Sequence, residues 1–108
     1  MSRFVVIGGA NVDIMGLADH PLRPQDSNPG TIRTMLGGVG RNLAENLARL
    51  GENVSLVSVV GDDSFGRWIL EQGQACGVDM RWVQSLPDQR TSAFLAILAP
   101  DHDLHSAI

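Results

Sequence analysis

Two groups of residues have the types and the spacing needed to bind a polyhydroxylated small molecule. Asn11 and Asp13 directly follow a short apolar run, and a Gly-Gly-Val-Gly-Arg-Asn turn occupies residues 37–42. A carboxylate such as Asp13 can accept hydrogen bonds from two neighbouring hydroxyls, while the Asn42 amide both donates and accepts. This combination suits a sugar such as ribose.

The glycine turn has a backbone suited to close contact with a ligand. Gly37 and Gly38 carry no side chain, and a helix that starts at Val39 offers N–H groups and the positive end of its dipole. The turn does not end in the Lys-Ser/Thr pair of a P-loop, and Leu43 stands where a dinucleotide fingerprint has glycine or alanine. Spacing alone leaves an alternative open, in which Asn11 and Asp13 cap a loop and Asn42 faces solvent.

The elements that must position these residues follow the order of an open α/β sheet. Residues 3–8 form an apolar, β-branched run typical of a strand buried on both faces, which we place at the centre of the sheet. Apolar residues at helical spacing predict a helix over 39–50, and residues 54–60 read as a second buried strand. Shorter strands are predicted at 81–83, 92–98 and 104–108, the last two joined by a turn.

A second helix is predicted between residue 64 and Gly77. Asp62, Asp63 and Ser64 supply side chains that can cap its start, so we assign the two aspartates a structural role. Its inner face is predicted to carry Phe65, Trp68, Ile69 and Ala75. Residues 12–36, by contrast, contain three prolines and two short candidate strands, 12–17 and 31–36, which predict a flap that leaves the sheet.

Composition and charge exclude several classes of function. The chain has 108 residues, 44% of them hydrophobic, and a net charge of −4 with all eight basic residues being arginine, so nucleic acid and anionic membranes are not expected partners. Cys76 is the only cysteine, which excludes an internal disulfide and favours a cytoplasmic location. His102 and His105 lie with two aspartates around a predicted turn, and we interpret them as solvated residues rather than metal ligands.

Three blocks of sequence resemble the ribokinase (PfkB) family of small-molecule kinases. They are residues 6–13, residues 37–42 with 47–51, and residues 60–66, in the order and spacing of that family. The resemblance implies an α/β fold: a ribokinase-like open, mostly parallel sheet flanked by helices, with a small β flap that serves as a lid. It also implies transfer of the ATP γ-phosphoryl group to an alcohol, assisted by Mg²⁺.

Within that family, the chain looks most similar to pseudouridine kinases. The similarity rests on the Asp-Ser-Asn-Pro-Gly segment at residues 26–30, on the glycine turn and on the Thr-Ser pair at 91–92. It implies phosphorylation of the 5′-hydroxyl of pseudouridine, and flaps that can pair two subunits into a homodimer. The implied roles are ribose binding by Asp13 and Asn42, a sugar lining made by Gly37, Gly38 and Val39, a pocket floor shaped by Asn11, and a lid over the nucleoside containing Ser27 and Asn28.

The catalytic half of such an enzyme is not found in this sequence. The family's Gly-Ala-Gly-Asp segment, which supplies an anion hole and the catalytic aspartate, does not occur, and neither does the adenine site. We therefore expect residues 1–108 to be the N-terminal part of a kinase domain, inactive alone, without its C-terminal ATP-binding part and with no assignable catalytic, metal or ATP-binding residue. Two alternatives remain: a kinase for ribose, fructose or adenosine, and a non-catalytic sugar-binding or interaction module.

Overall fold

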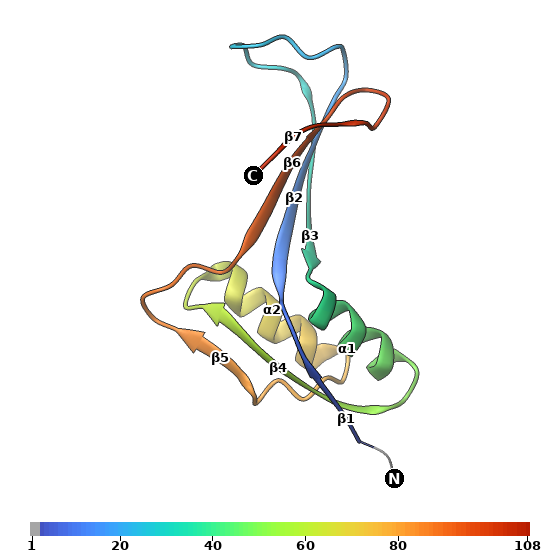
Figure 1. Ribbon diagram of the computed structural model, residues 1–108, viewed down its shortest axis with the longest axis vertical. Helices are drawn as coiled ribbons and strands as arrows, with labels where there is room; N and C mark the ends of the chain where they lie inside the picture. Colours follow the sequence, from blue (N-terminus) through green and yellow to red (C-terminus); the bar gives the residue numbers. More distant parts are fainter. Residues whose placement is uncertain (1–2) are drawn as a thin grey trace. The chain divides into compact units, whose positions relative to one another are not determined.

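The computed structural model describes residues 3–108, which form two compact units (Figure 1). Unit 1 contains the residues up to Val12 and Leu36–Ser92, and unit 2 contains Asp13–Met35 and Ala93–Ile108. The elements in chain order are β1 (Arg3–Ile7), β2 (Asn11–Ala18), β3 (Gly30–Gly37), α1 (Val39–Arg49), β4 (Asn53–Gly61), α2 (Ser64–Ala75), β5 (Val83–Leu86), β6 (Ala93–Leu98) and β7 (Leu104–Ala107). No helix within 3–108 is long and apolar enough to cross a membrane.

Unit 1 is built on a parallel sheet of three strands in the order β1-β4-β5, with both helices in contact with β4 (Figure 1). Leu56 and Val60 of β4 and Ile69 of α2 are fully buried. The prediction that the first strand is central is wrong for the described sheet. β1 lies at its edge, with Val5 59% and Ile7 80% exposed, because β4 is the strand with a neighbour on either side.

The two predicted helices are confirmed, but their inner faces differ from the apolar pattern. In α1 the buried residues are Gly40, Arg41 and Ala44, whereas Val39 is 85% and Leu43 50% exposed. Small residues face the sheet because they let the helix backbone come close to it.

The inner face of α2 follows the same principle. Ile69 is buried as predicted, Phe65 and Trp68 are half-buried, and Ala75 is exposed. Glycines again allow close contacts, since a Cβ atom on Gly66 would lie 2.1 Å from the Gly61 carbonyl oxygen and one on Gly73 would lie 2.4 Å from the Met80 sulfur.

Unit 2 is a four-stranded sheet in the order β3-β2-β6-β7. The two predicted flap strands are confirmed as β2 and β3. The placement of residues 92–98 as a continuation of the α/β sheet is wrong, because β6 lies beside β2 and forms an antiparallel hairpin with β7. An apolar run predicts a strand but does not identify its partner, which the pairing of distant segments decides.

Asp63 ties the start of α2 to the segment that leads into β6. Its carboxylate accepts the Gly66 N–H at 2.8 Å, which confirms the predicted cap, and also the Thr91 N–H at 2.8 Å and the Thr91 hydroxyl at 2.6 Å. The Thr91 hydroxyl oxygen in turn accepts the Gly61 N–H at 3.0 Å. The bonds from Thr91, followed by the bond from Gly66, lower the pKa of Asp63 below its ordinary value.

Asp63→Ala is therefore expected to lower the free energy of unfolding in a pH-dependent manner. A carboxyl whose pKa is lowered by folding stabilises the protein above its ordinary pKa, near 4, and loses this effect as the pH falls through the lowered value. Urea unfolding should show the full difference from wild type at pH 7 and a shrinking difference below about pH 4. Asp62→Ala is the control, because the exposed Asp62 carboxylate forms a 3.5 Å ion pair with Arg67, while its N–H bond to the Leu86 carbonyl oxygen is one that alanine retains; equal losses in both variants would contradict the expectation.

Candidate functional site

The glycine turn packs directly on the segment that joins β1 to β2. Gly38 precedes α1 with a φ of 97°, and a Cβ atom there would lie 2.5 Å from the Gly9 carbonyl oxygen. The same oxygen accepts the Arg41 N–H at 3.1 Å. No side chain of residues 3–108 caps this end of α1. The turn thus places the first turn of α1 beside residues 9–10, immediately before Asn11.

A second close contact joins the same two segments. A Cβ atom on Gly40 would lie 2.7 Å from the Cα and carbonyl carbon of Gly8, and one on Gly8 would lie 3.0 Å from the Gly40 Cα. Two of the sequence blocks that resemble the kinase family therefore meet through glycines. This contact positions the start of α1 against the carboxyl end of β1, where open α/β sheets bind ligands.

Asn11 and Asp13 alternate with Val12 along β2. Val12 is fully buried and donates its N–H to the Ser92 carbonyl oxygen at 3.0 Å, while Asn11 and Asp13 are half-buried. Successive side chains of a strand point to opposite faces, so Asn11 and Asp13 share the face opposite Val12. Both take part in interactions within the protein.

The predicted site residues divide between the two units. Unit 1 contains Asn11, the glycine turn from Gly37 to Val39, and Asn42. Asp13, Ser27 and Asn28 belong to unit 2. Asn42 is exposed in the first turns of α1, and its side-chain oxygen accepts a hydrogen bond from Arg41.

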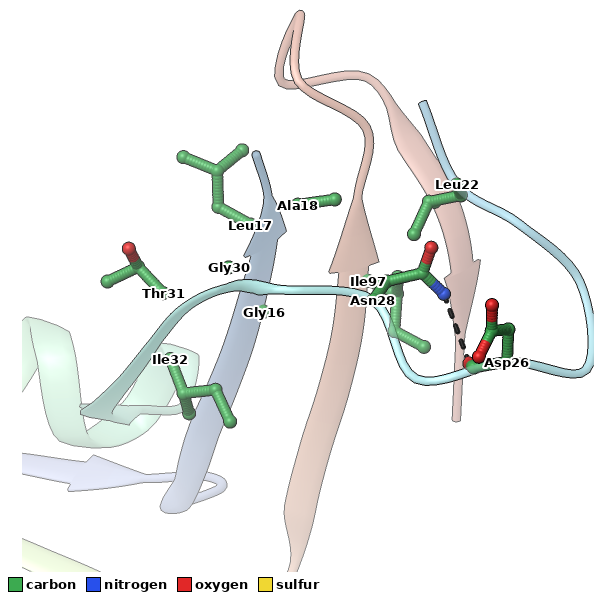
Figure 2. A pocket seen from close by; sticks show the side chains of 10 residues that line it. All are labelled: Gly16, Leu17, Ala18, Leu22, Asp26, Asn28, Gly30, Thr31, Ile32 and Ile97. Carbon is green, nitrogen blue, oxygen red and sulfur yellow. Dashed lines mark hydrogen bonds between the residues drawn. The ribbon is translucent and has the colours of Figure 1, made fainter. Parts of the chain in front are cut away.

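In unit 2, the Asn28 side chain forms hydrogen bonds within the loop in which it lies. Its side-chain oxygen accepts the Arg23 N–H at 2.8 Å, and its amide nitrogen donates to the carbonyl oxygens of Arg23 at 3.0 Å and Asp26 at 3.2 Å. Ser27 donates its N–H to the Asp26 carboxylate at 2.8 Å. Asn28 also lines a hollow of about 310 Å³ with apolar walls that include Ile32 and Ile97 (Figure 2). Contact of Ser27 or Asn28 with a nucleoside stays a prediction.

Arg41 is a functional candidate that the sequence did not indicate, although it is the charged member of the buried polar residues Arg41, Ser55 and Thr91. With Glu45 and Arg49 it forms an i,i+4 charge pattern, which is typical of a solvated helix face. Its position directly after Gly40 of the turn and before Asn42 could have identified it. A long, charged side chain at this position can reach the backbone at 36–37.

The residues that the structure describes contain no cluster of potential metal ligands. No group of three or more His, Cys, Asp or Glu side chains within 3–108 could hold a metal ion. His102 and His105 are exposed in the β6–β7 hairpin, where His105 contacts the neighbouring Ser106 hydroxyl.

Comparison with known proteins places the chain in a family. The sequence profile described as "pfkB family carbohydrate kinase" matches residues 1–107. The chain is 46% identical to the uncharacterized sugar kinase YeiI of Escherichia coli over 96% of its own length and 29% of that protein. It is 44% identical to the pseudouridine kinase of E. coli over 87% of its length and 30% of that protein. The chain thus spans about a third of the length of these relatives.

Solved structures agree with this placement. A carbohydrate kinase from Agrobacterium tumefaciens matches with a TM-score of 0.90 and 35% identity, over all of this chain and 35% of that one. Ribokinase from Arabidopsis thaliana, solved with ribose and ATP, matches with a TM-score of 0.86 and 29% identity, over 98% of this chain and 35% of that one. These matches confirm the predicted ribokinase-like α/β fold.

Proposed function

Because the chain belongs to the pfkB family of carbohydrate kinases, we propose that it is the sugar-binding part of an ATP-dependent kinase that phosphorylates the 5′-hydroxyl of pseudouridine. The observation that carries this proposal is the glycine turn, which sets the start of α1 against residues 8–10 and next to Asn11. The 44% identity to a pseudouridine kinase supports the choice of nucleoside.

In this proposal the chain's own residues bind and orient the sugar. The Asp13 carboxylate accepts hydrogen bonds from ribose hydroxyls, and the Asn42 amide binds a further hydroxyl. Gly37, Gly38 and Val39 line the sugar with backbone, and Asn11 shapes the floor of the pocket. These contacts position the acceptor hydroxyl. Positioning of the reactants and electrostatic stabilisation of the transition state together account for most of the catalysis of phosphoryl transfer.

Unit 2 is proposed to act as the lid, with Ser27 and Asn28 in the loop over the nucleoside. Phosphoryl transfer to an alcohol competes with transfer to water, so a lid that excludes solvent protects ATP from hydrolysis. The remaining parts of the proposal concern the whole protein. They are ATP and Mg²⁺ as cofactors, a C-terminal part that holds them, a homodimer formed through the lid, and a cytoplasmic location.

A substrate panel on the full-length protein tests the proposed function. With ATP and Mg²⁺, we expect kcat/KM for pseudouridine to exceed that for ribose, uridine, guanosine and adenosine by at least about tenfold, because a site that hydrogen-bonds one base leaves polar groups unpaired with another. Coupled measurement of ADP release gives the values. Guanosine is included because a guanosine-inosine kinase of Exiguobacterium acetylicum is 36% identical to the chain.

Three outcomes would contradict parts of the proposal. Phosphorylation of ribose but not pseudouridine would favour a sugar kinase. Sugar binding without any ATP-dependent phosphorylation would favour a non-catalytic module. Phosphorylation of pseudouridine by the isolated 108-residue chain would show that the catalytic residues lie within it.

A further inference from the structure

We propose that Arg41 is a positioning residue of the sugar site, which fixes the Asn42 side chain so that its amide N–H₂ group, rather than its oxygen, is presented to the ligand. The inference rests on the proposed function, since it concerns how that site recognises its substrate. It assigns a role to a residue that binds no substrate itself, and it gives Asn42 a defined hydrogen-bonding character.

The argument begins with the contacts of the Arg41 guanidinium, whose residue is 8% exposed. Nε donates to the Gly37 carbonyl oxygen at 3.0 Å, and Nη2 donates to the Leu36 carbonyl oxygen at 3.3 Å. Nη1 donates to the Glu45 carboxylate at 2.8 Å. Nη2 also donates to the side-chain oxygen of Asn42. Hydrogen bonds to four acceptors leave this group little freedom to move.

Chemistry decides which end of the Asn42 amide faces Arg41. A guanidinium has five N–H donors and no acceptor, so only the amide oxygen can face it favourably. The two N–H donors of Asn42 are consequently turned away from Arg41. Asn42 is exposed on α1, so these donors are accessible. They can bind a lone pair on a hydroxyl or ring oxygen of the ligand, but they cannot accept a hydroxyl proton.

The Arg41 guanidinium is also held by an ion pair with Glu45. Glu45 lies between Arg41 and Arg49, with one carboxylate oxygen 2.8 Å from Arg41 and the other 2.9 Å from Arg49. Hydrogen bonds from Arg41 first and Arg49 second lower the pKa of Glu45, so its carboxyl is charged at neutral pH. Charge-assisted bonds to Arg41 from one turn further along α1 keep the guanidinium against the glycine turn.

The same side chain fixes the backbone that precedes the helix. The carbonyl groups of Leu36 and Gly37 belong to the segment that enters the glycine turn, and both accept from Arg41. A lysine at position 41 has three donors on a single nitrogen and cannot bind four acceptors that the guanidinium reaches from three nitrogens. Arg41→Lys therefore keeps the positive charge but loses the arrangement of hydrogen-bond donors that the guanidinium provides.

The test is a double-mutant cycle in the full-length kinase with pseudouridine, ATP and Mg²⁺. Arg41→Lys is expected to raise KM for the nucleoside about tenfold, the effect of one misplaced hydrogen bond, and to leave KM for ATP unchanged. Asn42→Ala is expected to raise the nucleoside KM by at least as much. If Arg41 acts through Asn42, adding Arg41→Lys to Asn42→Ala produces less than a twofold further change.

The matched control is Arg49→Lys, which alters the other, exposed partner of Glu45 and is expected to leave both KM values unchanged. Additive effects of Arg41→Lys and Asn42→Ala would overturn the inference. Asn42→Asp provides a second test if Arg41→Lys does not fold: a carboxylate still pairs with Arg41 but cannot donate, so nucleoside binding should be lost. Wild-type affinity in Asn42→Asp would overturn the inference. A wild-type protein that phosphorylates no sugar would instead refute the proposed function, and this inference with it.

Discussion

Replacing Asp13 by alanine in the full-length protein is expected to raise the Kd for the proposed sugar or nucleoside by about 100-fold. A hydrogen bond to a charged group contributes about 1.5–3 kcal/mol, so the loss of two such bonds to hydroxyls costs about 3 kcal/mol. Isothermal titration calorimetry without ATP measures this affinity directly. Asp13→Asn, which keeps one acceptor and loses the charge, should fall between wild type and Asp13→Ala.

Asp19→Ala is the control for a change of charge nearby. Asp19 is exposed one residue beyond the end of β2, and its N–H bonds to the Pro29 carbonyl oxygen, an interaction that alanine retains. Its affinity for sugar should equal that of wild type. Unchanged affinity in Asp13→Ala would remove Asp13 from the proposed site.

Gly38→Ala is expected to destabilise the protein by about 3 kcal/mol. A left-handed backbone costs an alanine about 1–2 kcal/mol, and overpacking costs about 1–3 kcal/mol more. Both apply at Gly38, where φ is 97° and the new Cβ would lie 2.5 Å from the Gly9 oxygen and 2.7 Å from the Ala10 Cα. Neither neighbour is a side chain that could rotate away. Urea unfolding of the full-length protein gives the free energy.

Two other glycines separate the contributions to this effect. Gly51 has a φ of 86° with nothing within 4 Å of a new Cβ, so Gly51→Ala reports the backbone cost alone, about 1 kcal/mol. Gly9 has open space and no positive φ, so Gly9→Ala should stay within about 0.5 kcal/mol of wild type. If Gly38→Ala costs no more than Gly51→Ala, the close contact with residues 9–10 is not important for stability.

Much of the fold could be predicted because local signals were strong. Helix α2 begins after the cap at Asp63, as the sequence indicates. The positive-φ glycines at 51 and 77 follow the ends of α1 and α2, as the sequence also indicates. Long-range placement was harder. An apolar run such as β1 is typical of a buried strand, yet its exposure depends on which segments cover it, and the sequence of one strand does not contain that information.

The candidate site shows the same limit at the level of single residues. The sequence places Gly8 and Gly40 in separate blocks, and only the structure shows that a Cβ atom on Gly40 would overlap the backbone of Gly8. The pattern of Arg41, Glu45 and Arg49 is typical of a solvated helix face, and propensity rules do not indicate that Arg41 is buried. The backbone acceptors of Arg41, at Gly37 and Leu36, lie only four and five residues earlier, but they face its guanidinium because of the course that the chain takes through the glycine turn.

The division of unit 2 into two stretches of chain has a consequence for biosynthesis. Asp13–Met35 leaves the ribosome long before Ala93–Ile108, although β2 and β6 are neighbours in one sheet. Closing so long a loop costs entropy that local turns do not, and it slows the pairing of distant strands. Until β6 has been synthesised, the edge of β2 that pairs with it in the folded sheet stays unpaired. During translation, this edge is therefore open to non-native strand pairing.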